Sequence, residues 1–416
     1  MLRVFKRLDF SLLIAVGILL FISIFMILSA STVQLEGRQE AVLNVLKHLF
    51  ALSTGTLFFL FFLSINYKIL NRYWWVLYTG MIGLLVYVLY FGHASHGAQR
   101  WVNLGFFVFQ PSEAAKLVVI IALAAVLSRQ QKIDSFKALL PSLLLVGVPF
   151  IMVANQPDLG TALVFIFVLF GMLVMARATS KLLFLLSSPF ISLGLYYLFP
   201  QGYHAIWILY IIGLFAYLAS KKTPLADTFI CLLMNVCIVW IAPFFWQLLK
   251  PYQQERLMVF LKMDIDPMAQ GIRYHIDKSI TAVGSGGLWG QGWFSGALSH
   301  LQYIPVRNSD FIFSVIAEEF GFIGSSLVLF LLGTVIIRGI KTASAANDFF
   351  GSLLASGISF YFLFQVFVNI GMTLGIMPVV GIPLPFLSFG GSALVTNLSA
   401  IGLLGSIAYR RNKLFF

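Results

Sequence analysis

Long apolar stretches alternate with short polar ones along the whole chain. Twelve of them approach the length at which an α-helix crosses a bilayer, about 20 residues. They lie at 10–30, 46–64, 74–92, 112–128, 138–154, 159–176, 182–199, 204–220, 225–248, 311–338, 351–375 and 386–409. The pattern predicts an all-α, polytopic integral membrane protein with about 12 transmembrane helices, in which residues 1–416 form a single transmembrane domain. The stretches between 204 and 248 are the least regular, because His204, Pro224 and Pro243 interrupt them.

The composition excludes a soluble globular protein. Hydrophobic residues make up 60% of the chain and charged residues 10%, whereas about 25% of a soluble domain is charged. The first apolar run, residues 11–28, is followed by SAS and superficially resembles a cleaved signal peptide. Because the run is as long as a bilayer span, we expect a retained first helix. Cys231 and Cys237 share one apolar segment, so they indicate neither a disulfide framework nor a metal site.

The cations of the chain are concentrated in alternate loops. A net charge of +12 would suggest nucleic acid as the partner of a soluble protein, but in a membrane protein Lys and Arg mark cytoplasmic loops. With a cytoplasmic N-terminus, 17 of the 27 cations fall on that side: Arg3, Lys6, Arg7, Lys68, Arg72, Arg129, Lys132, Lys137, Arg177, Lys181, Lys221, Lys222, Arg338, Lys341, Arg410, Arg411 and Lys413. Both termini are therefore predicted in the cytoplasm, and residues 249–310 form one large extracytoplasmic loop.

Three acidic residues stand at the starts of predicted membrane helices on the outer side. Glu113 lies in QPSEAAK, Asp158 in NQPDLG and Asp310 in RNSDFIF. Residues typical of helix starts accompany them: Pro111, Pro157 and Ser309. The helix dipole stabilises an acid in this position without any function, so one such residue alone would decide nothing.

Three acids at one membrane face, together with nearby cations, favour a functional site. Charges inside a membrane must pair or line a water-filled cavity. The accompanying cations are Arg100, Lys116 and Arg307. Lys116 follows Glu113 by three residues, so an ion pair within one helix is the plainer explanation of both. The sharper interpretation is an outward-facing polar pocket.

Two glycine-rich stretches also lie on the outer side. Residues 375–392, GIMPVVGIPLPFLSFGGS, predict irregular backbone, which membrane proteins tolerate only where protein or a water-filled cavity surrounds it. The segment GSGGLWGQGW, within 284–293, lacks the strand and helix of a dinucleotide fingerprint. We expect its glycines to form tight turns that let backbone pack near the membrane surface; contact with phosphate through N–H groups is the weaker alternative.

Five stretches resemble, in the same order, the SEDS family (shape, elongation, division and sporulation proteins), and within it the RodA type. They are GAQRWVNLGFFVFQPSEAAK, NQPDLGTAL, DPMAQGIRYHIDKSITAVGSGGLWGQGW, IPVRNSDFIFSVIAEEFGFIG and NIGMTLGIMPVVGIPLPFLSFGGSAL. The resemblance implies a peptidoglycan glycosyltransferase of the bacterial cytoplasmic membrane that polymerises lipid II outside the cell membrane during elongation. It also implies a class B penicillin-binding protein and other elongation-complex membrane proteins as partners. Asp310 falls on the family's catalytic aspartate, and further positions fall on its cavity: Arg100, Trp101, Glu113, Lys116 and Asp158.

The sequence departs from the family pattern at several positions. The usual LPERHTD is IPVRNSD here, so that Val306 and Asn308 replace a frequent Glu and a frequent His. Val108 replaces a frequent basic residue, and GxGYH becomes GIRYH. The segment 204–248 is an additional helical pair against a family core of ten helices. None of these departures touches Asp310.

The implied reaction joins the C4 hydroxyl of one lipid-linked disaccharide to C1 of the growing strand. A hydroxyl is a poor nucleophile at neutral pH, so we assign Asp310 as general base. Arg100, Lys116 and Arg307 are the candidates for binding the leaving pyrophosphate. A divalent cation, magnesium or manganese, could assist, although no motif of metal-ligand spacing requires one. Trp101 stacks on sugar or lipid, or serves as an interfacial anchor.

Two other classes of function are compatible with parts of the sequence. A flippase for the lipid-linked precursor would also place charges near broken helices. The gathering of unusual segments on the outer side and the lack of an evident inverted repeat disfavour it. A scaffold that only positions a penicillin-binding protein would leave the intramembrane acids unexplained. We expect the adjacent Glu318 and Glu319 to brace the helix that follows Asp310 rather than to take part in catalysis.

Overall fold

A computed structural model of the chain describes residues 9–32, 38–95, 98–103, 105, 108–130, 132–197, 204–261, 272–300 and 308–411. The first half contains α2 (Phe10–Ser31), α3 (Arg38–Ser64), α4 (Lys68–Phe91), β1 (His93–Ser95), β2 (Ala98–Asn103), β3 (Val108–Phe109), α5 (Pro111–Leu127), α6 (Phe136–Asn155), α7 (Leu159–Met175) and α8 (Ser180–Tyr197). The second half contains α9 (His204–Ser220), α10 (Leu225–Leu248), α11 (Pro251–Phe260), α12 (Ile272–Ser285), α13 (Ala297–His300), α14 (Ile312–Ser344), α15 (Phe349–Thr373) and α16 (Gly391–Arg410).

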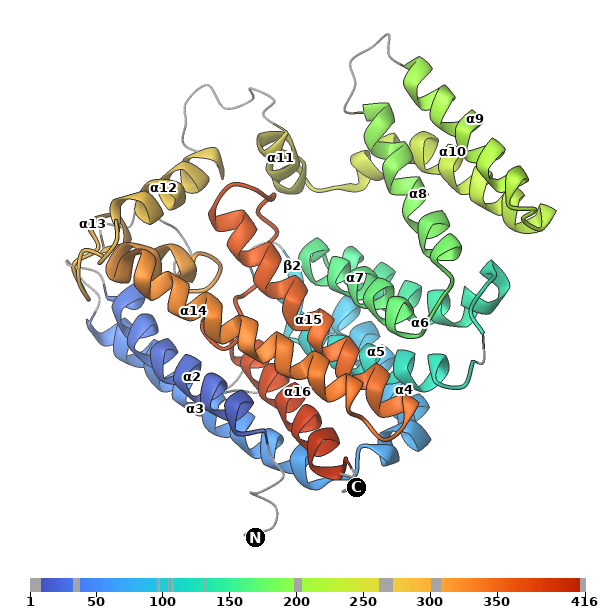
Figure 1. Cartoon of the computed structure of the whole chain (residues 1–416). Coiled ribbons are helices and arrows are strands. Elements are labelled where there is room, and N and C mark those ends of the chain that lie inside the picture. The colour runs from blue at the N-terminus through green and yellow to red at the C-terminus, as the bar shows by residue number, and fades with distance from the viewer. Residues whose placement is uncertain are drawn as a thin grey trace.

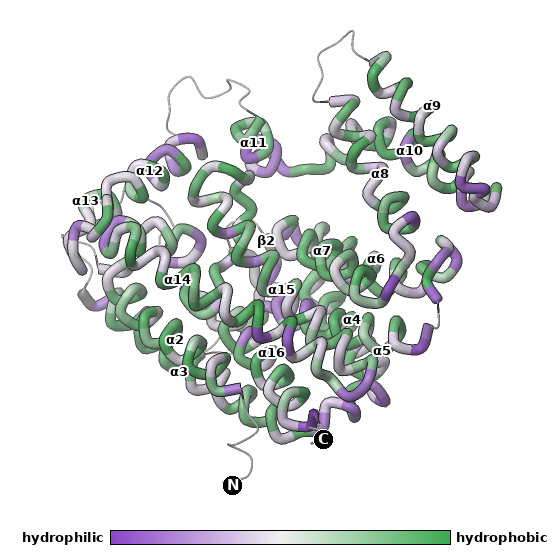
Figure 2. Tube along the Cα trace, viewed as in Figure 1, coloured by the Kyte–Doolittle hydropathy of each residue, from purple (hydrophilic) through white to green (hydrophobic). Residues whose placement is uncertain are grey.

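The predicted class, an all-α polytopic membrane protein, is confirmed. Each predicted apolar stretch coincides with a helix, and within the described residues eight helices are long and apolar enough to cross a membrane. Hydrophobic residues cover the shafts of the helices, while hydrophilic residues gather at helix ends and on α11 and α12 (Figure 2). The total of twelve spans stays a prediction, because helices such as α7 and α9 are shorter than 18 residues.

The helices that carry the candidate residues form the centre of the bundle. Among the eight apolar helices, α15 and α16 are the most enclosed by protein, and α5 is buried along most of its length. α2 and α3 flank this centre on one side, while α8, α9 and α10 stand apart at the upper right of Figure 1. The start of α2 and the end of α16 lie at the same end of the bundle (Figure 1). Which side of the membrane this end faces stays a prediction.

Three local features depart from the sequence prediction. The three strands β1, β2 and β3 form a small antiparallel sheet in that order, and they are too short to stand out from the surrounding sequence pattern. The last helix begins at Gly391 rather than near 386, because Ser388 and Phe389 bond to the carbonyls of residues 308 and 309 instead of continuing a helix. α14 contains a break at Gly321, where φ is +64°.

Candidate active site

Asp310 lies in a turn that immediately precedes α14. Its carboxylate accepts a hydrogen bond of 3.0 Å from the Ser309 hydroxyl. The N-cap of α14 is Phe311, so Ser309 does not cap the helix as its position had suggested. Asp310 as a residue is partly exposed, whereas the first residues of α14 behind it are buried. Asp310 therefore stands where the buried bundle meets an accessible surface.

The segment before α16 holds the Asp310 turn in place. The Phe389 N–H donates to the Asn308 carbonyl at 2.8 Å, and the Ser388 hydroxyl donates to the Ser309 carbonyl at 2.7 Å. Ser388 also accepts a bond of 2.8 Å from the Leu384 N–H, which closes the turn. The irregular backbone expected at 375–392 is confirmed for residues 375–390, and its polar groups fix the turn that carries Asp310.

Arg256, on α11, is the residue near Asp310 that the sequence did not indicate. Gly381 lies between the two side chains: a Cβ at Gly381 would lie 3.4 Å from Asp310 Oδ2 and 3.9 Å from Arg256 Nη1. Burial is the largest cause that raises the pKa of Asp310, and the negative charge of Asp158 raises it further. The hydrogen bond from Ser309 and the positive charge of Arg256 lower this pKa. The net pKa lies above the ordinary range for Asp, which suits a residue that must accept a proton near neutral pH.

The position of Arg256 follows from how α11 is anchored. The Pro157 carbonyl accepts hydrogen bonds from Tyr252 Oη at 3.2 Å and Gln253 Nε2 at 3.1 Å, both on α11. The same carbonyl accepts from Arg100, whose Nε also donates to the Gln156 carbonyl at 2.7 Å. Arg256 follows these anchors by about one helical turn. No sequence signal indicated this contact, because it depends on three distant segments meeting at Pro157.

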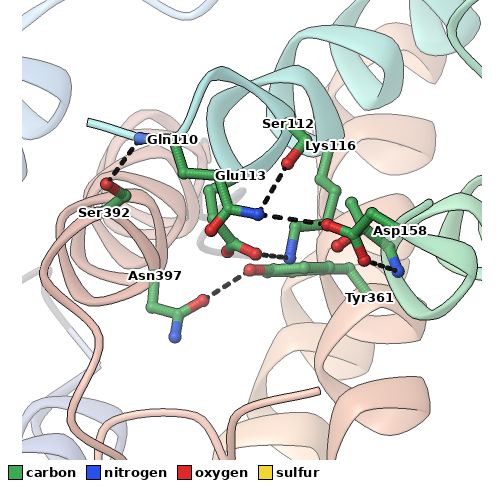
Figure 3. A network of polar contacts seen from close by, with 9 residues as sticks. Gln110, Ser112, Glu113, Lys116, Asp158, Tyr361, Ser392 and Asn397 are labelled. Carbon is green, nitrogen blue, oxygen red and sulfur yellow. Dashed lines mark hydrogen bonds and ion pairs between the residues drawn. The ribbon is translucent and has the colours of Figure 1, made fainter. Parts of the chain in front are cut away.

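Glu113 and Lys116 form the predicted ion pair inside α5. Lys116 Nζ lies 2.6 Å from Glu113 Oε1, and the two residues are only 1% and 3% exposed respectively. Lys116 Nζ also lies 5.4 Å from the centre of the Tyr361 ring, a cation–π contact. The Tyr361 hydroxyl in turn donates to Asn397 Oδ1 at 2.6 Å (Figure 3). The pair therefore joins α5 to α15 and α16.

Asp158 belongs to the same network through Gln110. The Gln110 amide donates to Asp158 Oδ2 at 3.1 Å and to Ser112 Oγ at 3.0 Å (Figure 3). Asp158 is also the N-cap of α7, because its Oδ1 accepts the Thr161 N–H at 3.2 Å. One carboxylate oxygen of Asp158 thus caps the start of α7, and the other accepts the hydrogen bond from Gln110. Pro157 precedes the helix rather than opening it, whereas Pro111 is the first residue of α5, as predicted.

Of the remaining predicted site residues, the structure describes Trp101 and Arg100 but not Arg307. Trp101, on β2, is partly exposed. Arg307 and Val306 lie outside the described residues. The guanidinium of Arg100 is directed at the carbonyls of Gln156 and Pro157, so Arg100 positions the start of α7. In the described part of the chain no group of three or more His, Cys, Asp or Glu side chains is placed to hold a metal ion.

Fold and site together define a class: a helical integral membrane protein with a buried ion pair and an accessible acid at one end of its bundle. The sequence profile of FtsW, RodA and SpoVE, described as cell cycle protein, matches residues 10–210 and 203–413. Peptidoglycan glycosyltransferase MrdB of Escherichia coli (strain K12) is 39% identical over 338 residues, covering 81% of this chain and 78% of MrdB. Peptidoglycan glycosyltransferase RodA of Treponema pallidum (strain Nichols) is 33% identical over 365 residues, covering 81% and 83%.

Solved structures agree with the sequence relatives. A chain from a peptidoglycan synthase complex, studied for the coordination of polymerization and crosslinking, aligns with a TM-score of 0.69 and 27% identity over 97% of this chain and 98% of that one. The rod shape determining protein RodA of Thermus thermophilus aligns with a TM-score of 0.62 and 26% identity over 98% of both chains. The chain belongs to the FtsW, RodA and SpoVE family, the SEDS family that its motifs resemble.

Proposed function

We propose that this protein is a peptidoglycan glycosyltransferase that polymerises lipid II into glycan strands during cell elongation. The observation that carries the proposal is the environment of Asp310: a partly exposed residue of raised pKa, in a turn fixed by the segment before α16 and near the cation of Arg256. The names of the relatives support the same activity, because MrdB and RodA are peptidoglycan glycosyltransferases.

Asp310 acts as the general base of the transfer. The C4 hydroxyl of one lipid-linked disaccharide gives its proton to the Asp310 carboxylate while its oxygen forms a bond to C1 of the growing strand. The bond between C1 and the pyrophosphate oxygen breaks, and undecaprenyl pyrophosphate leaves with the electron pair. Attack opposite the leaving group inverts the configuration at C1.

The leaving pyrophosphate needs cations, and Arg256 is the best placed of the described residues. Its Nε has no hydrogen-bond partner in the described structure although it is buried, and a guanidinium can bind phosphate through two parallel bonds. Lys116 is held by Glu113, and Arg100 is held by backbone carbonyls, so both support the site from behind. Arg307 remains a candidate for the pyrophosphate from the sequence.

The protein works at the bacterial cytoplasmic membrane as a multi-pass protein. Its termini lie in the cytoplasm and Asp310 lies outside, as the distribution of Lys and Arg indicates. Its partner is a class B penicillin-binding protein, which crosslinks the strands that this chain makes. The similarity to a chain of a peptidoglycan synthase complex supports such a partnership.

A flippase that moves the lipid-linked precursor is the alternative, and one assay separates the two. Purified protein and its class B penicillin-binding protein are reconstituted in liposomes with labelled lipid II. Formation of glycan polymer supports the glycosyltransferase. Movement of lipid II between leaflets without polymer, at every divalent metal concentration tried, would replace it with the flippase.

A further inference from the structure

The break at Gly321 divides α14 into two parts of different surroundings. From residue 322 to Ser344 the helix continues for about 23 residues, which rise about 34 Å at 1.5 Å each. The hydrocarbon core of a bilayer is about 30 Å thick, so this part alone spans it. Residues 312–319, before the break, are all buried in protein and lead back to Asp310. Gly321 therefore separates a part of α14 that is long enough to span the bilayer from the buried turns that lead back to Asp310.

A segment of the large loop satisfies the backbone groups that the break leaves open. The N–H groups of Gln291 and Gly292 donate to the carbonyls of Glu318 and Glu319, each at 3.0 Å. The N–H groups of Phe322 and Ile323 donate to the carbonyls of Gly287 and Leu288, at 2.9 and 3.2 Å. These pairs fix the segment 286–294, the aromatic loop, against α14. Because the N–H groups of Gln291 and Gly292 are bound to protein, they are not free to bind phosphate.

Glycine is required where the aromatic loop meets the break. A Cβ at Gly290 would lie 2.1 Å from the Glu319 carbonyl oxygen, and a Cβ at Gly321 would lie 2.4 Å from the Gly290 nitrogen. Both residues also have positive φ, +84° and +64°, a conformation that glycine adopts at little cost. The glycines of GSGGLWGQGW thus let two backbones approach closely, as the sequence predicted.

The side chains of the aromatic loop are large, apolar and exposed. Leu288 is 65% exposed, Trp289 80% and Trp293 43%. The Trp293 ring packs 5.5 Å from Phe25, on the membrane-spanning helix α2. From 279 to 306 the chain contains no Lys, Arg, Asp or Glu, which is unusual for a segment that faces water. A loop in lipid must have its backbone polar groups satisfied by protein, and the pairing with α14 supplies such bonds.

We propose that the aromatic loop inserts into the lipid interface on the Asp310 side of the membrane, with Trp289 and Leu288 among the lipid headgroups and upper acyl chains. Trp is the side chain that this level of a bilayer favours, and the loop lies beside two membrane-spanning helices, α2 and α14. The partner is the bilayer itself rather than a protein, because the exposed aromatics continue the apolar surface of those helices. If the protein is the glycosyltransferase proposed above, the loop fixes the height of Asp310 over the lipid anchor of the substrate.

The Glu318 side chain connects the aromatic loop to the segment that follows it. Its Oε1 accepts a hydrogen bond of 2.7 Å from the Leu298 N–H at the start of α13. Glu319 accepts a hydrogen bond from the Ser29 hydroxyl of α2. The two acids therefore hold α2, α13 and the break of α14 together, as their expected role in bracing the helix requires.

Spin labels test the location of the aromatic loop without relying on enzymatic activity. The native cysteines are first removed by Cys231→Ser and Cys237→Ala. A single spin label is then attached to Trp289→Cys or to Leu288→Cys. The control label is at Asp277→Cys, an exposed position of α12 in the same large loop. Collision of each label with oxygen, which concentrates in lipid, is compared with collision with a water-soluble nickel complex, in lipid nanodiscs.

We expect the labels at 288 and 289 to collide mainly with oxygen, at a depth of about 5–10 Å, while the label at 277 collides mainly with nickel. Equal nickel accessibility at 289 and 277 would place the loop in water and overturn the proposal. Protection from both reagents would show that protein, such as a second copy or a partner helix, covers the loop, and would also overturn it. Absence of glycan polymerisation by the wild-type protein would refute the proposed function, but it would not change what the spin labels show about the location of the aromatic loop.

Discussion

The side-chain amide of Asn369, on α15, donates a hydrogen bond of 2.9 Å to the backbone carbonyl of Asp310. The same Nδ2 donates to the Ile382 carbonyl at 2.7 Å, and Asn369 is fully buried. One amide thus joins the turn that carries Asp310 to the segment that precedes α16. The geometry of the proposed base therefore depends on a buried side chain of α15.

Replacing Asn369 with Leu should impair the chemical step. Both carbonyls would lose their donor, and a displacement of Asp310 by about 1 Å costs up to about 100-fold in rate. We expect kcat to fall about 10- to 100-fold with little change in KM, measured as glycan polymerisation at varied lipid II concentration. The matched control is Asn235→Leu, which also replaces a fully buried Asn, on α10 away from the site. A similar loss in both variants would mean that Asn369 acts only in folding.

The Glu113–Lys116 pair should show strong coupling in a double-mutant cycle. Lys116→Met leaves the buried Glu113 without its counter-ion, a change that costs about 3–5 kcal/mol in comparable buried pairs. Glu113→Gln combined with Lys116→Met should recover most of the lost thermal stability, because no unpaired charge remains. Thermal unfolding of Lys116→Met, Glu113→Gln and the double variant in detergent gives the coupling. Additive losses in the double variant would contradict a mutual ion pair.

The Asp310 carboxylate should lower the stability of the folded protein at neutral pH. Burial raises its folded pKa above the unfolded value, so the folded state binds the extra proton. Its contribution to stability is therefore greatest below the unfolded pKa and is lost as pH rises through the folded pKa. Asp310→Asn should raise the melting temperature at pH 7 and remove this pH dependence. An unchanged melting profile would show that the folded and unfolded pKa values of Asp310 are equal.

Arg256 should control the acid limb of the pH–rate profile. Its positive charge lowers the pKa of Asp310, so Arg256→Gln should raise that pKa and move the loss of activity on acidification to higher pH. KM for lipid II should also rise, because a cation for the pyrophosphate is removed. Arg256→Lys should return the acid limb close to its wild-type pH, because Lys keeps the positive charge. KM for lipid II should recover less, because Lys cannot bind phosphate through two parallel bonds. A profile unaffected by Arg256→Gln would exclude contact with Asp310.

Local patterns predicted the parts of the structure that depend on neighbouring residues. The spans follow from apolar runs, and the Glu113–Lys116 pair follows from a spacing of three residues on one helix. The break at Gly321 was missed, because hydropathy continues through it and only pairing with residues 287–292 reveals it. Arg256 was missed for the same reason: its place near Asp310 depends on the anchoring of α11 at the Pro157 carbonyl.

The start of α16 shows how tertiary bonds override an apolar pattern. Residues 386–390 are as apolar as the helix that follows, and the sequence alone assigned them to it. In the structure Phe386 has φ +65°, and Ser388 and Phe389 bind the turn of Asp310 instead of continuing a helix. The residues that are irregular instead of helical are thus the ones that bond to the turn of Asp310, the proposed base.

The most direct test of the account compares two carboxylate replacements in glycan polymerisation from labelled lipid II, with the cognate class B penicillin-binding protein present. Asp310→Asn removes the proposed base, and Asp277→Asn removes an exposed carboxylate of the same large loop. We predict no detectable polymer from Asp310→Asn, with folding and partner binding intact, and near wild-type polymer from Asp277→Asn. Full activity of Asp310→Asn would contradict this prediction and direct the search for the base to Asp158 and Glu113.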